Sequence, residues 1–401
     1  MRVLFIISDL GFHGAQKQVV ELSKGLAAGG HDVAIYTLND DAARATELEG
    51  SGVQLVVDQK RTKLDPGVLW RLNRFIRRLR RYVRTWRPDI IHGFLFDGDI
   101  YARIASIGTG ALVFNSERSA NYAISRTQLW AHRLTHGLVH AVVANSHAGA
   151  RFAEKLYGYD PARMHVVWNG MRIDEFARKG ESARDYRDEF FGPGDYKVAC
   201  MIGHIKPAKD YPLAVDVAAE LVKRWPQWRV LFLGEALSGT GEYKTGADSD
   251  TSDYKRGVVE KYRRLPLEHR ERIVFAGARS DAPAILKQCD VQLITSAWEG
   301  FPNVVLEGMV LGVPVVSTDY SDIRQILPRM DQVVASRDPE ELAKAVVTVA
   351  ADREAVAAEQ ERWVQAHAGI EKATQELERV YQRYLHPAPR ALAARELREE
   401  G

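Results

Sequence analysis

Glu299 and Glu307 stand eight positions apart in a segment that follows a strand-like apolar run, 291–296, and opens a helix-like one. Gly300 lets a ligand approach the backbone closely, and Pro302 suits the first positions of a helix. A helix start at the carboxyl end of a strand presents free N–H groups and a positive dipole end, which favour a phosphate. Carboxylates repel phosphate, so we expect one to bind sugar hydroxyls and the other to face a carbon that becomes positive. The segment therefore predicts a nucleotide-sugar site.

Further segments extend this signal over most of the chain. Glu299 and Glu307, followed by Gly-Val-Pro-Val-Val-Ser-Thr-Asp at 312–319, resemble the donor-site signature of retaining glycosyltransferases of family 4. The resemblance continues in the first strand and its loop, in 168–171 and in 203–209. It implies an α/β protein of GT-B architecture, in which two Rossmann-like, doubly wound parallel-sheet domains face each other across a cleft.

The resemblance implies separate roles for the two carboxylates. Glu307 would accept both hydroxyls of a ribose, as a carboxylate can. Glu299 would bind hydroxyls of the donor sugar and stabilise the oxocarbenium-like transition state of glycosyl transfer. Retaining enzymes of this type are thought to react on the front face of the donor, with the leaving phosphate deprotonating the acceptor. We therefore expect Glu299 to act electrostatically and not as a covalent nucleophile.

A cationic segment would neutralise the departing diphosphate. The family pattern is Gly-Arg, a short gap and Lys, and this chain has Gly203-His204 and then Lys209. The resemblance assigns Lys209 to the leaving group, whose charge grows in the transition state. His204 stands where arginine is usual, and a neutral imidazole donates a single hydrogen bond. Lys206 is a candidate to compensate, and we expect neither a metal nor another cofactor.

Backbone groups would complete the donor site. They are expected at Gly300, Phe301 and Pro302. Asn303 would either bind phosphate or cap the helix. The resemblance places amides of Gly11 and Gly14, which follow the first strand, at the donor diphosphate, and an ordinary strand–helix turn is the alternative. The spacing of these glycines does not match G-x-G-x-x-G, which argues against a dinucleotide.

Polar residues after two predicted strands suggest the acceptor side. His92 ends the strand 89–92 and would point into the cleft, because α/β folds bind ligands at the carboxyl ends of their strands. Members of the family often carry a histidine near here, so His92 is a catalytic candidate, and a satisfied structural histidine is the alternative. Glu117 and Arg118 follow the next strand, and Arg118 could bind an acceptor phosphate. Asn-Gly at 169–170 is more typical of a turn.

Strands and helices alternate along the chain, as in parallel, doubly wound sheets. Continuous apolar runs indicate strands that are buried on both faces. They occur at 3–7, 32–38, 89–92, 111–114, 141–144, 165–168, 198–202, 230–233, 273–276 and 291–296. The chain has 401 residues, which is too long for one ordinary core and predicts two domains.

The two domains are expected to have different tasks. We predict an N-terminal, acceptor-side domain at 1–180 and a C-terminal, nucleotide-sugar-binding domain at 195–370. A polar linker at 176–196 would join them. Residues 371–401 would form a helix that crosses back toward the N-terminal domain, and then a tail. The stretch 238–253, rich in Gly, Ser, Thr and Asp, is expected to be a mobile loop.

The helix predicted at 70–86 is strongly basic. Its apolar residues recur at helical spacing, and arginines without any acid fill most other positions. The arginines are Arg71, Arg74, Arg77, Arg78, Arg80, Arg81, Arg84 and Arg87. One explanation is a solvated helix face, and the other is attraction to an anionic membrane, worth about 1 kcal/mol per basic residue. Nucleic acid is not an expected partner, because no base-reading module accompanies the charge.

Composition is that of a globular protein, with 46% hydrophobic residues, 27% charged residues and a net charge of +2. Cys200 and Cys289 lie in apolar runs and are expected in the core, not in a disulfide or metal site. No run approaches the roughly 20 apolar residues that span a bilayer, and the apolar start is too short for a signal segment. We expect a cytoplasmic protein, with any membrane association peripheral and on the inner face of the cytoplasmic membrane.

The leading hypothesis is a retaining, metal-independent glycosyltransferase of the hexosyl- or N-acetylhexosaminyl-transferring kind. It would move a sugar from a UDP- or GDP-sugar to a glycan or lipid-linked acceptor in the synthesis of an envelope polysaccharide or glycolipid. The alternatives are a UDP-sugar epimerase, an inverting GT-B transferase, and a membrane-bound scaffold that has lost turnover. His204 favours the scaffold, whereas intact Glu299, Lys209 and Glu307 argue against it.

Overall fold

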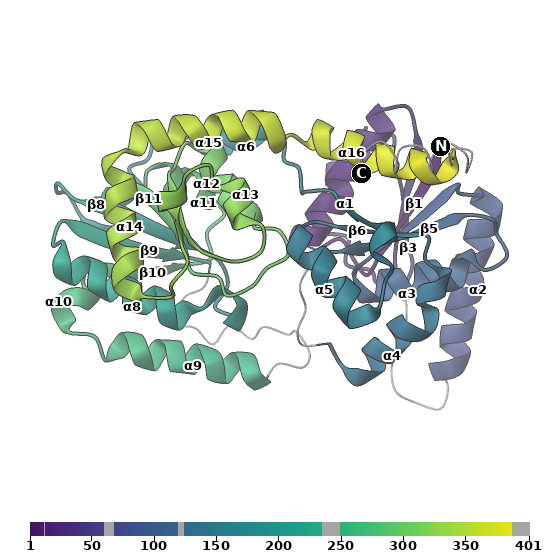
Figure 1. Ribbon diagram of the computed structural model, residues 1–401, viewed down its shortest axis with the longest axis horizontal. Helices are drawn as coiled ribbons and strands as arrows, with labels where there is room; N and C mark the ends of the chain where they lie inside the picture. Colours follow the sequence, from purple (N-terminus) through teal and green to yellow (C-terminus); the bar gives the residue numbers. More distant parts are fainter. Residues whose placement is uncertain (12, 60–67, 119–123, 235–248, 387–401) are drawn as a thin grey trace, which may run out of the picture. The chain divides into compact units, whose positions relative to one another are not determined.

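The computed structural model describes residues 1–11, 13–59, 68–118, 124–234 and 249–386, without the side chains of 68–72 and 249–252. The chain divides into two compact units (Figure 1). Unit 1 is Met1–Met171 together with the C-terminal segment that starts at Ile370, and unit 2 is Arg172–Gly369. The chain therefore leaves unit 1 before the linker that the sequence predicts at 176–196.

Parallel strands form the sheet of unit 1, and their order among the described residues is β3-β2-β1-β4-β5-β6-β7. The strands are β1 (Arg2–Ile7), β2 (Asp32–Thr37), β3 (Gln54–Val57), β4 (Ile90–Phe94), β5 (Leu112–Glu117), β6 (Ala141–Ala144) and β7 (Met164–Val166). The α-helices are α1 (Gly14–Ala28), α2 (Val68–Trp86), α3 (Leu95–Ser106), α4 (Arg126–Thr135), α5 (His147–Tyr157) and α16 (Ile370–Leu385). Short 3₁₀ helices are η1 (Ala45–Leu48), η2 (His136–Leu138) and η3 (Pro161–Arg163).

The central strand β1 shows why unit 1 has helices on both faces of its sheet. Alternate side chains of a strand point to opposite faces, and Val3 to Ile7 are all 0% exposed. Phe5 and its odd-numbered neighbours pack with apolar residues of α1 and α16. Leu4 and Ile6 pack with α2 and α3 on the opposite face. A strand buried on both sides needs an unbroken apolar run, which is the pattern at 3–7.

Unit 2 repeats this plan with a sheet in the order β10-β9-β8-β11-β12-β13 among its described residues. The strands are β8 (Lys197–Ile202), β9 (Trp228–Leu233), β10 (Ile273–Gly277), β11 (Val291–Ile294), β12 (Val315–Thr318) and β13 (Val333–Val334). The α-helices are α6 (Ile173–Lys179), α7 (Tyr186–Phe191), α8 (Tyr211–Arg224), α9 (Ser249–Arg263), α10 (Leu267–Arg270), α11 (Ala282–Lys287), α12 (Asn303–Val310), α13 (Ile323–Ile326), α14 (Pro339–Ala351) and α15 (Arg353–His367). Two 3₁₀ helices are η4 (Pro207–Lys209) and η5 (Met330–Gln332).

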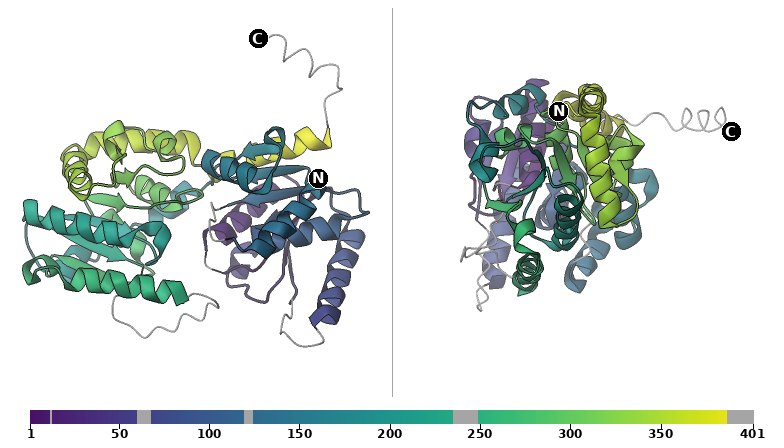
Figure 2. Two further views of the ribbon diagram at one scale, coloured as in Figure 1. Left: turned by 60° about the horizontal axis from the view of Figure 1, so that its bottom comes forward. Right: turned by 90° about the vertical axis from the view of Figure 1, so that its left-hand side faces the viewer.

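The core of unit 2 lies between β8, β9, β11 and the helices α8 and α14. Ala199 and Met201 of β8 face these helices and are buried. Val198 faces the other side, toward α7 and α11. Figure 2 shows helices along the strands of each unit from two further directions. Each unit is thus a parallel α/β layer structure with its own core.

Two predictions about connecting segments are wrong. Residues 176–196 are not a linker, because α6 and α7 form there and pack within unit 2. Arg187, for example, donates to Asp290 in that unit at 3.3 Å. The end of the loop predicted at 238–253 is helical, since α9 begins at Ser249. The rest of that loop, 235–248, lies outside the described residues, as does the tail at 387–401.

The strand orders identify where each sheet can bind a ligand. In doubly wound sheets the crevice lies at the carboxyl ends of the two strands where the order reverses. These strands are β1 and β4 in unit 1, and β8 and β11 in unit 2. Lys209 and Glu299 follow β8 and β11 in unit 2, whereas His92 lies inside β4, two residues before its carboxyl end, and not at the strand end that the sequence predicts. The topology therefore carries several predicted site residues to these two edges.

Candidate functional site

The carboxyl edge of the unit 2 sheet brings Lys209 and Glu299 into direct contact. Lys209 Nζ lies 2.6 Å from Glu299 Oε1. The two side chains are 11% and 17% exposed, so the ion pair is largely screened from solvent. The loops that carry them follow β8 and β11, the two strands at the reversal of strand order. A cation and a carboxylate are therefore held together where a doubly wound sheet binds its ligand.

Hydrogen bonds from β11 and β12 fix the position of Glu299. Ser296 donates its hydroxyl to Glu299 Oε1 at 2.5 Å. The backbone oxygen of Ser296 accepts from Thr318 Oγ1, at the end of β12, at 2.7 Å. The same carboxylate oxygen thus accepts from a hydroxyl and an ammonium, while the loop that carries it is tied to the neighbouring strand.

Hydrogen bonds also fix the loop that carries Lys209. Thr295 Oγ1 donates to the backbone oxygen of Lys209 at 2.8 Å, and Ala297 N donates to Ala208 O at 2.8 Å. The Lys209 stem passes over Gly203, where an added Cβ would lie 3.2 Å from Lys209 Cε. Because Gly203, directly after β8, has no side chain, the Lys209 side chain can pass over it to reach Glu299.

Arg337 links the loop that carries Lys209 to the segment that leads to Glu299. Its guanidinium donates to Asp210 Oδ2 at 2.5 Å and to Thr295 O at 3.1 Å. Asp210 has a φ of 45°, in the left-handed region that non-glycine residues rarely adopt. Ser321 has a φ of 49° and donates its hydroxyl to Gly300 O at 2.5 Å. Backbone strain of this kind persists when surrounding bonds over-determine it, and it gathers at functional sites.

A second cation lies beside the ion pair. The Lys206 side chain is exposed, yet desolvation by the surrounding residues and, next, the positive charge of Lys209 lower its pKa. Two ammonium groups that repel each other at one edge would both be stabilised by an anionic ligand. His204 is exposed on the same loop.

Helix α12 begins after the Glu299 loop, as the sequence predicts. Pro302 is the N-cap residue and Asn303 the first helical residue, so Asn303 does not cap the helix. Glu307 lies one turn into the helix and is half-buried. Phe301 is buried at 5% exposure, while its carbonyl accepts from Asn303 N at 3.0 Å. The roles of these residues toward a donor stay predictions.

His92 in unit 1 lies deeper than a substrate-contacting residue would. Its side chain is 0% exposed. Nδ1 lies 2.5 Å from the hydroxyl of Tyr381 on α16, and Nε2 lies 2.8 Å from Ser116 Oγ. Burial and the nearby Arg118 charge lower the pKa of His92, which keeps the ring neutral. This geometry is that of the satisfied structural histidine, and it offers no free nitrogen for catalysis.

The two acceptor-side candidates lie on opposite sides of the end of β5. Arg118 stacks over Phe94, with its central carbon 4.6 Å from the ring centroid. It donates to Asn169 Oδ1 at 3.0 Å and to Ser116 Oγ at 3.3 Å. Glu117 lies instead against α5, where its Cγ would be 3.7 Å from a Cβ at Gly149. Successive strand residues point to opposite faces, so the sequence neighbours do not form one site.

The glycine loop after β1 offers less to a diphosphate than the sequence suggests. The amide of Gly11 already donates to Asp9 Oδ1 at 3.0 Å. An added Cβ at Gly11 would lie 3.1 Å from Asp41 Oδ2, so two carboxylates border this position. Gly14 is the first residue of α1, whose N-cap residue His13 makes no side-chain cap. The α1 start therefore stays a phosphate-site candidate through Gly14, while the Gly11 amide is occupied.

The basic helix α2 is amphipathic, with Phe75, Leu79 and Val83 buried in the unit 1 core. Two of its arginines have local partners. Arg78 pairs with Asp58 at 2.7 Å, and Arg80 donates to the carbonyls of the α3 terminus, including Ile107 O at 2.9 Å. The exposed arginines among those with described side chains are Arg74, Arg77, Arg78, Arg81 and Arg84 on α2, and Arg87 directly after it. The side chain of Arg71 is not described.

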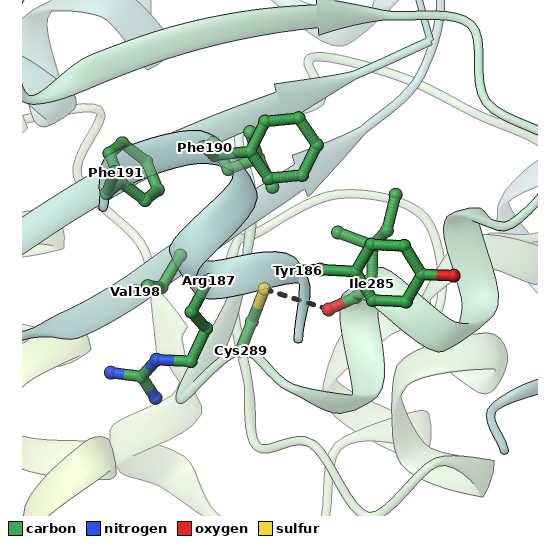
Figure 3. A pocket seen from close by; sticks show the side chains of 8 residues that line it. Tyr186, Arg187, Phe190, Phe191, Val198, Ile285 and Cys289 are labelled. Atoms are coloured by element: carbon green, nitrogen blue, oxygen red, sulfur yellow. Dashed lines mark hydrogen bonds between the residues drawn. The ribbon is translucent and has the colours of Figure 1, made fainter. Parts of the chain in front are cut away.

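A cavity between α7, α11 and β8 is too small to bind a substrate (Figure 3). It has a volume of about 10 Å³, room for about one water molecule. Its lining is mostly apolar and includes Cys289, whose thiol donates to Ile285 O at 3.3 Å. Cys200 and Cys289 are both buried and free, as the sequence predicts. This cavity is a packing void near the amino end of β8.

Sequence reasoning missed several residues that build these edges. Ser296 and Arg337 belong to no recognised motif. A polar residue at the carboxyl end of a predicted strand is nevertheless a signal for a ligand site. Asn169 was interpreted as a turn residue, yet its side chain binds Arg118. Tyr320 is buried near Glu299, and burial with that negative charge raises the pKa of the Tyr320 hydroxyl. Tyr381 reaches unit 1 from the end of the chain, which local spacing cannot reveal.

Two features are absent from the described residues. No three histidine, cysteine, aspartate or glutamate side chains lie close enough there to hold a metal ion. No helix in the described part of the chain is both long and apolar enough to cross a membrane.

Family models match both units. The model for Glycosyltransferase Family 4 matches residues 12–175, and the model for Glycosyl transferases group 1 matches residues 196–352. The chain belongs to glycosyltransferase family 4. This family-4 chain is 30% identical over 183 residues to a D-inositol 3-phosphate glycosyltransferase of Kineococcus radiotolerans, over 46% of its own length and 40% of the relative. A D-inositol 3-phosphate glycosyltransferase of Geodermatophilus obscurus is 30% identical over 234 residues, or 57% of this chain and 48% of the relative.

The family-4 chain spans less than half the length of these curated relatives. Solved structures match over a longer span. Anabaena Alr3699/HepE in complex with UDP has a TM-score of 0.76 and 20% identity, over 94% of this chain and 99% of that one. At this identity the likeness shows the fold, and the fold is the GT-B architecture with two parallel α/β units.

Proposed function

We propose that this family-4 chain is a retaining, metal-independent glycosyltransferase that uses a UDP- or GDP-sugar. The sugar is a hexose or N-acetylhexosamine, and the acceptor is a glycan or lipid-linked sugar of an envelope polysaccharide or glycolipid. No cofactor takes part, and the nucleotide sugar is a substrate. Solved neighbours support a nucleotide-sugar donor, since Anabaena Alr3699/HepE was solved with UDP and with UDP-glucose.

The observation that carries the proposal is the Lys209–Glu299 pair, with Lys206 beside it. Cations at the carboxyl edge neutralise the diphosphate as its bond to the sugar breaks, and their effect is large because the site is partly screened from water. Glu299 binds donor hydroxyls and stabilises positive charge at the anomeric carbon. Glu307 accepts the ribose hydroxyls from α12. The leaving phosphate takes the proton of the acceptor hydroxyl, so no side chain acts as a covalent nucleophile.

A peripheral membrane location fits the outer helices of unit 1. Arg74, Arg77, Arg81 and Arg84 are spaced three or four residues apart and share one exposed face of α2. Helices α2, α3 and α4 pack in a row. On α4, Trp130 and Leu134 are 63% and 77% exposed. Arginines attract anionic headgroups, and a large exposed aromatic side chain suits the boundary between water and lipid.

Two enzymatic alternatives use the same donor edge. A UDP-sugar epimerase would convert the donor without an acceptor, and an inverting transferase would change the configuration at the anomeric carbon. The relatives' name, D-inositol 3-phosphate glycosyltransferase, favours transfer to an acceptor over epimerisation.

The deciding experiment is a binding screen of the purified chain against UDP, GDP and their sugars by calorimetry, followed by product analysis. We expect one nucleotide to bind at least tenfold more tightly than the other, and its sugar to be transferred with retention of configuration. Failure of every nucleotide sugar to bind would overturn the proposal. Conversion of the donor without an acceptor would replace it with the epimerase, and inversion would replace it with the inverting transferase.

A further inference from the structure

Arg118 makes no close ion pair in the described part of the chain, and the charges of Glu117 and Asp99 act on it only from a longer distance. Its two hydrogen bonds go to neutral oxygens, Asn169 Oδ1 and Ser116 Oγ. Its Nε is buried and has no hydrogen-bond partner. A guanidinium has five N–H donors, and the described residues use only part of this capacity. Arg118 is half-buried with its Nε enclosed, and a partly desolvated cation is stabilised by an anion more than by solvent alone.

The surroundings hold the guanidinium in one plane. Phe94, the last residue of β4, covers one face of it at 4.6 Å. Asn169 binds it from the loop after β7, and Ser116 binds it from β5. Burial lowers the pKa of Arg118 to about 10, which leaves it charged at neutral pH. The residue follows β5 at the carboxyl edge of the sheet, where doubly wound sheets bind ligands. A guanidinium that is held in place, charged, and has donors that no described residue uses is suited to bind an anion at that edge.

A chain of hydrogen bonds connects this guanidinium to the last helix. Ser116 Oγ accepts from Arg118, and we assign its own proton to the bond with His92 Nε2, 2.8 Å away. A neutral histidine has one donor and one acceptor nitrogen. His92 Nδ1 is then the donor, and it lies 2.5 Å from the Tyr381 hydroxyl. Tyr381 is 0% exposed and comes from α16. This direction is part of the inference, because a Ser116 oxygen that accepted from both neighbours would give the other tautomer of His92.

We propose that Arg118 binds a phosphate group carried by the acceptor, and that His92 and Tyr381 are positioning residues that hold it ready. This inference rests on the proposed function. A phosphate ester offers several oxygens around one centre, which suits a guanidinium that binds them in a fork. The phosphate belongs either to a water-soluble sugar phosphate or to a lipid headgroup, and the chemistry of recognition is the same.

The test compares phosphorylated with neutral probes on the full chain. Calorimetry at pH 7.5 measures binding of glucose 6-phosphate and of glucose, in a Lys209→Ala background so that the donor cations contribute less. A second arm measures sedimentation with phosphatidylcholine vesicles with and without phosphatidylglycerol. Arg118→Gln and Arg118→Lys are compared with Arg151→Gln, a control at an exposed arginine of α5.

We expect a preference for the phosphorylated probe of about tenfold to a hundredfold, the size of one charge-assisted hydrogen-bond set. Arg118→Gln should abolish it, Arg118→Lys should keep part of it, and Arg151→Gln should leave it unchanged. A preference seen only with vesicles and lost in Arg118→Gln identifies the phosphate as a lipid headgroup. If neither arm depends on Arg118, the inference is wrong.

Tyr381→Phe tests positioning separately from packing, because it keeps the ring and removes the hydroxyl. We expect ¹⁵N NMR to show one neutral His92 tautomer, with Nδ1 protonated, in the wild type and a mixture in Tyr381→Phe. The phosphate preference should fall in parallel. A variant that melts earlier but keeps the single tautomer and the full preference would reduce Tyr381 to a structural residue and remove it from the inference.

Nucleotide-sugar titrations of the wild-type chain and of Arg118→Gln, both with Lys209 intact, separate the two proposals. Arg118-dependent phosphate binding in a chain that binds no nucleotide sugar would overturn the proposed function and keep this site. Nucleotide-sugar binding without any Arg118-dependent phosphate binding would do the opposite.

Discussion

Lys209 Nζ and Glu299 Oε1 lie 2.6 Å apart although 90 positions separate the two residues in the chain. The contact crosses the two strands at which the order of the unit 2 sheet reverses. Each residue is the counter-ion of the other, and an arriving diphosphate would compete with Glu299 for the ammonium. The ion pair therefore has both a structural role and a role in the proposed chemistry. Substitution of Lys209 and substitution of Glu299 should have different effects.

Lys209→Ala should lower turnover by about 10²- to 10³-fold, the loss typical of one electrostatic stabiliser. It should also lower the free energy of unfolding, because Glu299 would be left largely buried without its cation. Initial rates with saturating donor and thermal melts measure the two effects. Lys197→Ala, at an exposed lysine of β8, is the matched control. Wild-type rates in Lys209→Ala would contradict the site assignment.

Glu307→Ala should weaken nucleotide binding by about tenfold to a hundredfold, since a charged acceptor of ribose hydroxyls is removed. The loss should be smaller for a 2′-deoxynucleotide, which lacks one of those hydroxyls. Calorimetry with UDP and 2′-deoxy-UDP, or the corresponding guanine nucleotides, makes the comparison. Glu268→Ala on α10, with a side chain 74% exposed, is the control. Equal losses for both nucleotides would point to a defect other than ribose recognition.

Replacing Arg77 and Arg81 of α2 with glutamine should release the protein from anionic vesicles. Each basic residue near such a surface contributes about 1 kcal/mol, so two should weaken partitioning by roughly thirtyfold. Raising the salt concentration should have the same effect, because it screens exposed charges. Sedimentation with phosphatidylglycerol vesicles measures it. Arg263 and Arg264 of unit 2 are also exposed, and their double glutamine variant serves as the control. Unchanged sedimentation of the α2 variant would leave only a solvated helix face.

Acid should destabilise the protein through His92. Burial lowers its pKa in the folded chain, while the unfolded chain keeps a value of about 6.5. Below about pH 6.5 the unfolded chain binds a proton that the folded chain does not, so the free energy of unfolding falls as pH falls. The slope is up to about 1.4 kcal/mol per pH unit for one such residue.

The measurement is urea unfolding between pH 5 and pH 8. His132, with a pKa lowered by burial to about 3, should add a slope of the same sign. His92→Gln should reduce the slope between pH 5 and 6.5 while the difference at pH 8 reports lost packing alone. A variant with the full wild-type slope would show that His92 titrates normally in the folded protein.

Gly25→Ala should loosen α16 from unit 1. The added Cβ would lie 2.3 Å from Thr374 Oγ1, which is too close, so a helix must shift. Overpacking of this kind costs about 1 to 3 kcal/mol, more than the roughly 1 kcal/mol that alanine gains in a helix. Gly257→Ala on α9, where nothing lies within 4 Å, should instead stabilise the protein. Thermal melts compare the two, and Thr374→Ala should partly rescue Gly25→Ala. Stabilisation by Gly25→Ala would contradict the packing.

Periodicity and motif spacing predicted the alternating strands, the family, the start of α12 and the burial of both cysteines. These features are local, because a strand buried on both faces needs an unbroken apolar run such as 3–7. The end of unit 1 was not predicted. Polar composition at 176–196 suggested a linker, yet α6 and α7 bury Phe176 and Tyr186 against unit 2. A few apolar residues at the right positions suffice to pack short helices against unit 2. The average composition of a polar segment does not reveal such residues.

The sequence by itself determined which residues lie near the carboxyl edges of the two sheets, because short runs of residues specify where strands end and helices begin. Only the tertiary structure decided what those residues do there. It paired Lys209 with Glu299, enclosed His92 between Ser116 and Tyr381, and turned Glu117 and Arg118 to opposite faces. Those outcomes depend on which side chains arrive from distant strands and from the last helix, and on how much water they exclude. Charge, hydrogen bonding and burial are properties of such neighbourhoods, and spacing along one chain does not contain them.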